Sequence, residues 1–436
     1  MGVLATLDSQ LTTFLVEVGT IFRALRNRNY RLYFTGQIVS LIGIWMQTVS
    51  IGWLTYRLTQ SALMVGITGF FTQIPMLILT PVAGVFIDRW DKKKVILIMQ
   101  WVLMTQALML AILTLMGTVQ YWHVIVLSLY YGMATAFEGP ARQAFVIEMI
   151  EDKEDLGNAI ALNSMMFNSA RLVGPAVAGI LISVFNEGVC FLINGLSFSA
   201  VIISLNLMTG EALRKKGVRE NFFAGLKSGF KYVYEFDTIR VIIFMVALIN
   251  LLCLPYTLLM PVVAREVLHG GAREQGFLVS ASGIGALIGG LYLASRKTVV
   301  GLVNVLSAAA FIFGFGLIAL SFSRVLWLSV LTMFIAGLGM ILSMASCNTL
   351  VQTLVDDDKR GRVMSIYMMA AIGVLPFGHL LMGALAKMFG APVALLTGGT
   401  GCIIGAVVFA LNLPRYVRKL YRVYIDKGMI ESSINV

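Results

Sequence analysis

The stretch "GVFIDRWDKKK", residues 84–94, lies where one apolar run of the chain ends and the next begins. Its charged residues are Asp88, Arg89, Asp91, Lys92, Lys93 and Lys94. Charges at such density are excluded from the hydrocarbon core of a bilayer, because an unpaired charge there is costly. We therefore interpret residues 84–94 as a short loop between two membrane-spanning helices, and this interpretation sets the class of fold.

The composition also indicates a membrane protein. Of the 436 residues, 58% are hydrophobic and only 13% are charged, whereas a soluble domain is about one quarter charged. Apolar runs of roughly 20 residues, the length that a helix needs to cross a bilayer, recur along almost the whole chain. We expect an all-α membrane protein whose partner is the lipid bilayer. The formal charge of +11 requires no nucleic-acid partner.

Twelve spans are predicted, in two groups of six. Their approximate ranges are 32–57, 62–87, 95–117, 122–147, 158–184, 187–208, 240–264, 275–295, 300–322, 325–350, 362–389 and 391–413. The groups form bundles at 31–208 and 240–413, joined by a polar cytoplasmic linker at 209–239. Apolar residues at helical spacing predict a membrane-surface helix in the segment 1–30, and 414–436 is interpreted as a basic cytoplasmic tail.

Basic residues are unevenly distributed among the predicted connections. Most of the 33 Lys and Arg residues fall on the side that carries both termini, the 84–94 loop and the linker. Because basic residues collect on the cytoplasmic side of a membrane, we expect a multi-pass protein of the cytoplasmic (inner) membrane with both termini cytoplasmic. The four cysteines lie in apolar runs, so no disulfide framework is expected.

The two halves of the chain resemble each other. When "EDLGNAIALNSMMFNSARLVGPAVAGILISVF" is aligned with "DKRGRVMSIYMMAAIGVLPFGHLLMGALAKMF", identical residues recur at one constant interval. The matching pairs are Gly157 and Gly361, Gly174 and Gly378, Gly179 and Gly383, Phe185 and Phe389, and Gly195 and Gly399. Parallel repeats about an axis along the membrane normal are a transporter architecture, with the substrate path between them. The residues expected at close helix contacts are Gly174, Pro175, Gly179, Gly378 and Gly383.

The spacing Gly84-x-x-x-Asp88-Arg89-x-x-Lys92-Lys93 resembles the signature of the major facilitator superfamily, which has glycine where this chain has Asp91. The resemblance covers nearly the full length. Stretches such as "FEGPARQAFVIEMI" and "NSARLVGPAVAG" are similar to the transmembrane secretion effectors, a branch with enterobactin-exporter-like proteins that is grouped with drug–proton antiporters. It implies a twelve-helix, proton-driven exporter with two pseudo-symmetric halves in a bacterial cytoplasmic membrane.

The 84–94 loop is predicted to act as a gate latch. Gly84 allows close helix approach, and Asp88 at the membrane boundary needs a cation or a helix N-terminus as partner. The resemblance implies that Asp88 bears on the start of span eleven when the cytoplasmic side is closed, and Arg142 is a second candidate partner. The predicted gate residues are Gly84, Asp88, Arg89, Lys92, Lys93, Arg142, Arg360 and Arg362. The alternative is that the lysines only enforce topology.

Two departures from the antiporter pattern concern proton coupling. In the signature of span five, Ala170 and Ala178 replace two glycines, so the pattern is degenerate although small residues persist. Ser128 stands where related antiporters often carry an intramembrane arginine. Proton coupling must therefore run through other groups.

Arg171 and Glu138 are the ionisable groups expected deep in the membrane. Arg171 lies near the midplane in span five, and Glu138 lies in the antiparallel span four. Because such residues are costly and usually functional, we predict that they pair and serve as a proton and charge relay, with Arg142 as an exchange partner one turn from Glu138. A permanent structural ion pair is the alternative. If Glu138 does not neutralise it, Arg171 indicates an anionic cargo.

Uncharged polar residues avoid most of the peripheral spans, and this favours a central substrate cavity. The candidates are Gln37, Gln47, Asn163, Asn168, Asn250, Asn348, Gln352 and His379. The alternative is that each makes an interhelical hydrogen bond, and that His379 is a core residue.

The expected function is secondary transport. No zinc-protease, nucleophile-elbow or phosphate-loop motif is found, so we expect no enzyme, no metal site and no cofactor. The favoured prediction is a monomeric, proton-coupled exporter of small amphipathic molecules, of drug or siderophore type, that works by alternating access. The alternatives are a lysolipid or lipid flippase, a proton-coupled importer, and a membrane sensor of the same fold.

Overall fold

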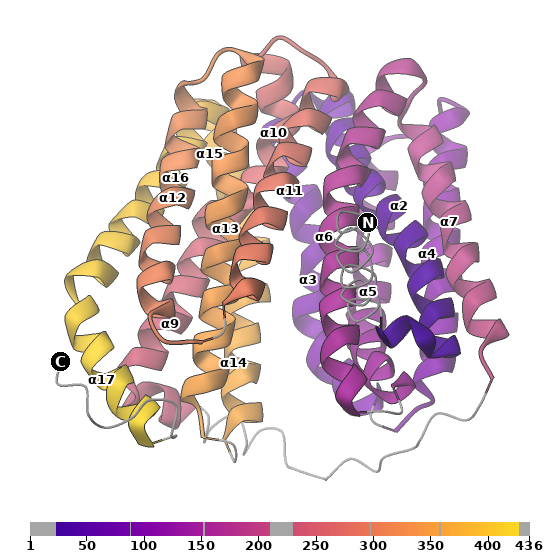
Figure 1. The fold of residues 1–436 in the computed structure, drawn as a ribbon. Helices are drawn as coiled ribbons and strands as arrows, with labels where there is room; N and C mark the ends of the chain where they lie inside the picture. The colour runs from indigo at the N-terminus through magenta and orange to yellow at the C-terminus, as the bar shows by residue number, and fades with distance from the viewer. Residues whose placement is uncertain are drawn as a thin grey trace, which may run out of the picture.

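The computed structural model of the chain describes residues 23–87, 89–150, 153–209, 230–296, 298–356 and 359–426. Two helical bundles lie side by side (Figure 1). After the short η1 (Arg23–Arg26), the first bundle contains α2 (Arg28–Thr59), α3 (Ala62–Ile87), α4 (Lys92–Leu115), α5 (Tyr121–Met149), α6 (Lys153–Val184) and α7 (Glu187–Leu207). The second contains α9 (Asp237–Leu248), η2 (Ile249–Cys253), η3 (Leu254–Leu259), α10 (Met260–Val262), η4 (Val263–Val267), α11 (Ala272–Ser295), α12 (Leu302–Phe322), α13 (Leu326–Leu354), α14 (Arg360–Ile372), α15 (Leu375–Phe389) and α16 (Ala391–Leu411).

Eleven segments of the described chain are long and apolar enough to cross a membrane. They match the predicted spans closely, and α3 has the predicted bounds. The remaining predicted span is α5, which is 29 residues long but more polar, because it begins with Tyr121, Trp122 and His123 and carries Glu138 and Arg142. The multi-span, all-helical character is therefore confirmed for the described residues, whereas the count of twelve stays a prediction.

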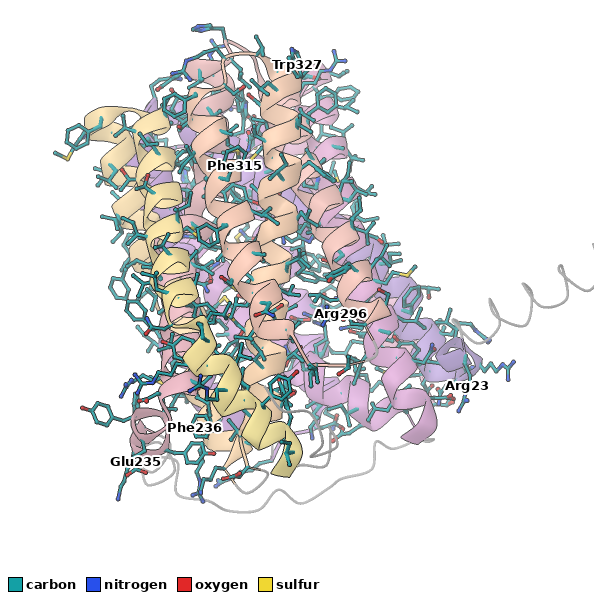
Figure 2. All side chains as sticks on the ribbon, turned by 60° about the vertical axis from the view of Figure 1, so that its left-hand side comes forward. Arg23, Glu235, Phe236, Arg296, Phe315 and Trp327 are labelled. Atoms are coloured by element: carbon teal, nitrogen blue, oxygen red, sulfur yellow. The ribbon has the colours of Figure 1, made fainter. Side chains whose placement is uncertain are left out.

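Large apolar side chains point outward from the bundles. Figure 2 shows Phe315 and Trp327 on the outer surface, and they are 59% and 70% exposed. The labelled charged residues, such as Arg296 and Glu235, lie lower in that view, toward one end of the helices. Exposed apolar surface of this extent marks a lipid-facing or interaction surface, and a bilayer around the middle of the helices would cover it.

Two spans of the second bundle are broken. Span seven passes from α9 through π-helical and 3-10 turns, and it contains Pro255 and Pro261. Span eleven is interrupted between α14 and α15, directly before Pro376. Proline lacks the amide proton that a continuous helix needs and clashes with the preceding turn. The N-terminal bundle tolerates Pro175 inside a continuous α6, so the two halves differ in whether a helix continues through its proline.

The repeated glycines occupy equivalent contacts in the two halves. A Cβ at Gly179 of α6 would lie 3.0 Å from the Cα of Gly276 in α11, and a Cβ at Gly383 of α15 would lie 2.9 Å from the Cα of Gly66 in α3. Each contact joins one bundle to the other, and Figure 1 shows α6 beside α11 at the junction. We call these two contacts the glycine seams.

The two bundles share a buried core at one end only. We call the end at which α2 begins and α3 ends the basic end, and the opposite one the far end. Met46, Val49 and Val65, in the far halves of α2 and α3, belong to one core with residues of the second bundle. At the basic end, a separate core around Tyr33 and Met166 contains, among the described residues, only members of the first bundle. The halves are therefore packed together at the far end and separate toward the basic end.

Some expectations concern the ends of the chain. The predicted surface helix falls mostly within residues 1–22, and most of the linker within 210–229, both outside the described residues. The predicted basic tail begins with a helix, α17 (Leu413–Asp426). Its buried residues Tyr416, Leu420 and Tyr424 lie one turn apart, which is the spacing of one helix face.

The glycine seams should control opening of the far end. Gly383→Ala places a methyl group 3.0 Å from the carbonyl oxygen of Ala62, an overpacking that costs about 1–3 kcal/mol. We expect the far end to open more often. A cysteine at Val49, which is 3% exposed in the shared core, should then react with a water-soluble thiol reagent about tenfold faster, since about 1.4 kcal/mol is a tenfold change.

Gly361→Ala is the matched control, because a Cβ at Gly361 would meet no atom within 4 Å. The four native cysteines are buried, so the background labelling is low. Equal labelling rates in the two variants would contradict a gating role for the seam.

Candidate functional site

The charged loop after α3 is held against the first bundle. The side chain of Asp91 accepts a hydrogen bond of 3.2 Å from a backbone amide in the first turn of α4. Asp91 is therefore the N-cap of α4, which gives a reason for an aspartate where the superfamily signature has glycine. Lys92 Nζ lies 2.6 Å from Glu148 Oε1, and Lys93 Nζ donates a hydrogen bond of 3.1 Å to the carbonyl oxygen of Met208. These contacts fix the loop to the ends of α5 and α7.

The structure describes the other predicted gate residues only in part. Asp88 lies outside the described residues. Among the described residues the expected close helix approach at Gly84 is not seen, since a Cβ there would meet no described atom within 4 Å. Arg89 is exposed, while Arg360 and Arg362 lie in the first turn of α14. The latch between Asp88 and α14 therefore stays a prediction.

Glu138 pairs with Arg142 rather than with Arg171. Arg142 Nε lies 3.0 Å from Glu138 Oε1, and their side chains are 16% and 10% exposed. The two residues are one turn apart on α5, so their side chains meet without crossing between helices. Tyr33 of α2 lies beside Arg142, and its hydroxyl is 3.5 Å from the side-chain oxygen of Asn163 on α6. The predicted Glu138–Arg171 pair is therefore corrected to a cluster within the first bundle.

Arg171 reaches toward the second bundle. Its Nη2 lies 3.2 Å from Met340 Sδ on α13, and its guanidinium carbon lies 5.4 Å from the centre of the Trp45 ring. The Trp45 ring packs edge to face against Phe167 at 5.8 Å. In the part of the chain that the structure describes, no carboxylate forms an ion pair with Arg171. This arginine thus lies between the two halves next to aromatic and thioether groups.

The predicted cavity residues of the first bundle separate into two kinds. Gln47 donates a hydrogen bond of 3.0 Å to Gln106 and accepts one of 2.8 Å from Asn194. It therefore connects α2, α4 and α7, which agrees with the alternative that it makes interhelical hydrogen bonds. Gln37 is also buried, at 2% exposed. Asn168 is partly exposed and donates its hydrogen bond to a backbone carbonyl of its own helix.

The predicted cavity residues of the second bundle lie on three spans. Asn250 is buried in η2 and donates 2.8 Å to the carbonyl of Val246 within the same span. Gln352 donates 3.1 Å to Asn348 on α13, and Gln352 is exposed. His379 is 9% exposed at the α3–α15 seam, where a Cβ at Gly69 would lie 2.5 Å from its Nδ1. His379 is therefore an interface residue rather than a core residue of one bundle.

The far-end closure includes polar contacts that the sequence did not predict. Tyr56 at the end of α2 donates a hydrogen bond to Glu266 of η4, and Gln275 of α11 donates one of 3.3 Å to the carbonyl of Val49. Both contacts cross between the halves. These residues lie near the far ends of their helices, and only the packing of the bundles brings them together. Their polar character was the only signal available in the sequence.

Comparison with solved structures concerns the fold of the chain. The structure of a bacterial homologue of the human lysosomal transporter Spinster, in an inward-facing and unoccupied conformation, is similar with a TM-score of 0.66 and 14% sequence identity, over 92% of this chain and 98% of that chain. This likeness shows that the two chains share one fold. The particular family follows from sequence: the chain belongs to the transmembrane secretion effector family, whose profile matches residues 19–420.

Two relatives whose names describe small-molecule transport are similar to this chain over most of its length. The chain is 28% identical to the staphyloferrin A transporter of Staphylococcus aureus, over 83% of this chain and 90% of the relative. It is 24% identical to the macrolide efflux protein A of Streptococcus pyogenes, over 87% and 96%. The protein is therefore a multi-pass membrane transporter and not an enzyme, as the sequence predicted.

The Glu138–Arg142 pair should show strong energetic coupling. Replacing one partner of a buried ion pair leaves an uncompensated charge and costs about 3–5 kcal/mol. We expect Glu138→Gln and Arg142→Gln each to lower the free energy of unfolding, and the double variant to be less destabilised than the sum of both. Chemical unfolding in detergent micelles measures the three values.

The exposed pair Lys231–Glu235, with side chains 79% and 62% exposed, is the control. Such surface pairs contribute at most about 1 kcal/mol, so its cycle should be close to additive. An additive cycle at Glu138 and Arg142 would show that the two side chains do not stabilise each other.

Proposed function

We propose that the protein is a proton-coupled exporter of small amphipathic molecules, of siderophore or drug type, that works by alternating access. The observation that carries this proposal is the one-sided packing of the halves. They share a buried core and two glycine seams at the far end, and separate cores toward the basic end. Such an arrangement supports one of two states, since rocking about the seams would open the far end and close the basic end.

The names of the relatives support the proposed direction of transport. A staphyloferrin A transporter and a macrolide efflux protein are both similar to this chain over most of its length. Export is therefore the favoured mode in our proposal, and siderophores and drugs are the favoured cargo classes. Without an ATP-binding motif in the sequence, we assign the driving force to an ion gradient.

Glu138 is the proposed proton site. As a carboxylate it balances Arg142 at 3.0 Å in a largely buried position. Protonation would remove that attraction and leave Arg142 with an uncompensated charge, which is costly in such surroundings. Arg142 would then need another acceptor, and the predicted one is Asp88 of the gate loop. Proton binding at Glu138 would in this way be linked to the state of the gate.

The surroundings of the protein are part of the proposal. The positive-inside rule favours a cytoplasmic membrane with the basic end in the cytoplasm, and the bacterial relatives fit an inner membrane. Both described ends of the chain, η1 and α17, lie at the basic end in Figure 1. We propose a monomer as the working unit, because the substrate path lies between halves of one chain.

The decisive experiment measures proton flux in proteoliposomes that enclose a pH-sensitive dye. A proton gradient is imposed, and siderophores, macrolides, lipophilic cations and lysolipids are added in turn. We expect one cargo class to drive proton flux in the native protein and at least tenfold less in Glu138→Gln, because the carboxamide cannot carry the proton.

Glu187→Gln is the matched control. Glu187 is also buried, at 2% exposed, and pairs with Arg57 at 2.8 Å in the first bundle, but it lies at the far end. The Glu187→Gln variant should have a lower free energy of unfolding but keep the cargo-dependent proton flux. Cargo movement that ignores the gradient and survives Glu138→Gln would overturn proton coupling and favour a uniporter or a lipid flippase.

A further inference from the structure

We propose that Arg171 is the residue that selects the cargo, and that it binds a carboxylate group on an amphipathic, aromatic molecule. This inference rests on the proposed transport function and names the class of its cargo. It starts from a charge without a counterion. Arg142, the other arginine deep in the first bundle, is balanced by Glu138, whereas Arg171 has no acidic partner among the described residues.

An unbalanced arginine at this depth requires compensation. Arg171 lies about 20 Å from the C-terminal end of α6 at 1.5 Å per residue. This position is well inside a membrane span. Ionisable residues at such depth face the interior, pair with one another or mark a substrate pathway. An anionic ligand would supply the missing counterion when the site is loaded.

The contacts of the guanidinium leave room for a better acceptor. Its Nε is shielded from solvent without a hydrogen-bond partner. Its Nη2 faces Met340 Sδ at 3.2 Å, and a thioether sulfur is only a weak acceptor. A carboxylate forms much stronger, charge-assisted hydrogen bonds with arginine, often two in parallel. A cargo carboxylate would therefore displace the methionine contact with a net gain.

The neighbours of Arg171 favour an aromatic body next to the anion. The Trp45 ring lies 5.4 Å from the guanidinium carbon, and Phe167 packs against that ring. Phe167 is itself 40% exposed, so its free side can take part in ring stacking. Met340 supplies an adaptable apolar contact from the other half. The charged guanidinium of Arg171 thus lies beside apolar side chains, which is the combination that an amphipathic cargo requires.

The face of α6 that leads to Arg171 is open from the basic end. Gly157, Ser164 and Phe167 are exposed, and they lie fourteen, seven and four positions before Arg171, on one face of the helix. Beyond Arg171 the same helix is closed by the seam at Gly179. In this conformation Arg171 is therefore the last polar group before the closed seam on α6, where a cargo entering from the basic end would stop.

The test uses a reporter cysteine two turns from Arg171. Ser164→Cys is introduced into the full chain in nanodiscs, and its labelling by the neutral reagent methyl methanethiosulfonate is timed. Two probes are compared: 2-naphthoate, which carries a carboxylate, and 2-naphthamide, which has nearly the same shape without charge. We expect naphthoate to slow labelling at least fivefold in the presence of Arg171, and naphthamide to have little effect.

Variants of the arginine then identify its role. Arg171→Gln should abolish protection by naphthoate, and Arg171→Lys should retain part of it, because the charge remains but the planar fork is lost. Met165→Cys, 43% exposed on a neighbouring face, should show no protection. The proposal would be overturned if naphthoate protected the native protein and Arg171→Gln equally. It would also be overturned if both probes protected equally, or if naphthoate gave no protection.

A second measurement remains informative if Arg171→Gln folds poorly. In the Arg171 background, Ser164→Cys should react about tenfold faster with an anionic than with a cationic thiosulfonate of equal size, since a unit charge about 10 Å away favours one and repels the other. Arg171→Lys should keep that ratio. A ratio near one would overturn the proposal. Neither measurement needs a proton gradient or net transport, so failure of proton coupling at Glu138 and failure of the carboxylate site give different results.

Discussion

Close backbone packing at the glycine seams is the contact on which the arrangement of the two halves depends. Lipid tails are as apolar as the helices, so helices in a membrane gain little by hiding apolar side chains from them and associate through close packing instead. Gly66 against Gly383 and Gly179 against Gly276 provide such packing. Because both seams lie at the far end, the bundles can remain joined there while they separate at the basic end.

The position of the seams also decides which charges meet water. Arg142 and Glu138 lie within the first bundle and neutralise each other on one helix. Arg171 lies on the helix that forms a seam, two turns before Gly179. It therefore points between the halves at the depth where closure begins.

Span positions and the repeat could be predicted because both depend on local properties of the chain. The length of an apolar run fixes a helix such as α3, and glycine at a constant interval fixes equivalent contacts. Whether Glu138 pairs with Arg171 depends instead on the distance between two helices, which a sequence does not contain. In the structure Glu138 pairs with Arg142, one turn away on the same helix. The break in span eleven had a signal in Pro376, but Pro175 shows that a proline alone does not decide between a break and a continuous helix.

The repeat explains why the two halves contribute different chemistry to one path. The interval that aligns Gly174 with Gly378 aligns Arg171 with Leu375. The first bundle thus carries a charge at a position where the second carries an apolar residue directly after a helix break. The continuous α6 carries the charge, while spans seven and eleven of the second bundle are interrupted. If the first bundle binds the carboxylate and the interrupted spans of the second bundle contact the rest of the cargo, one carboxylate site could hold cargoes of different shape.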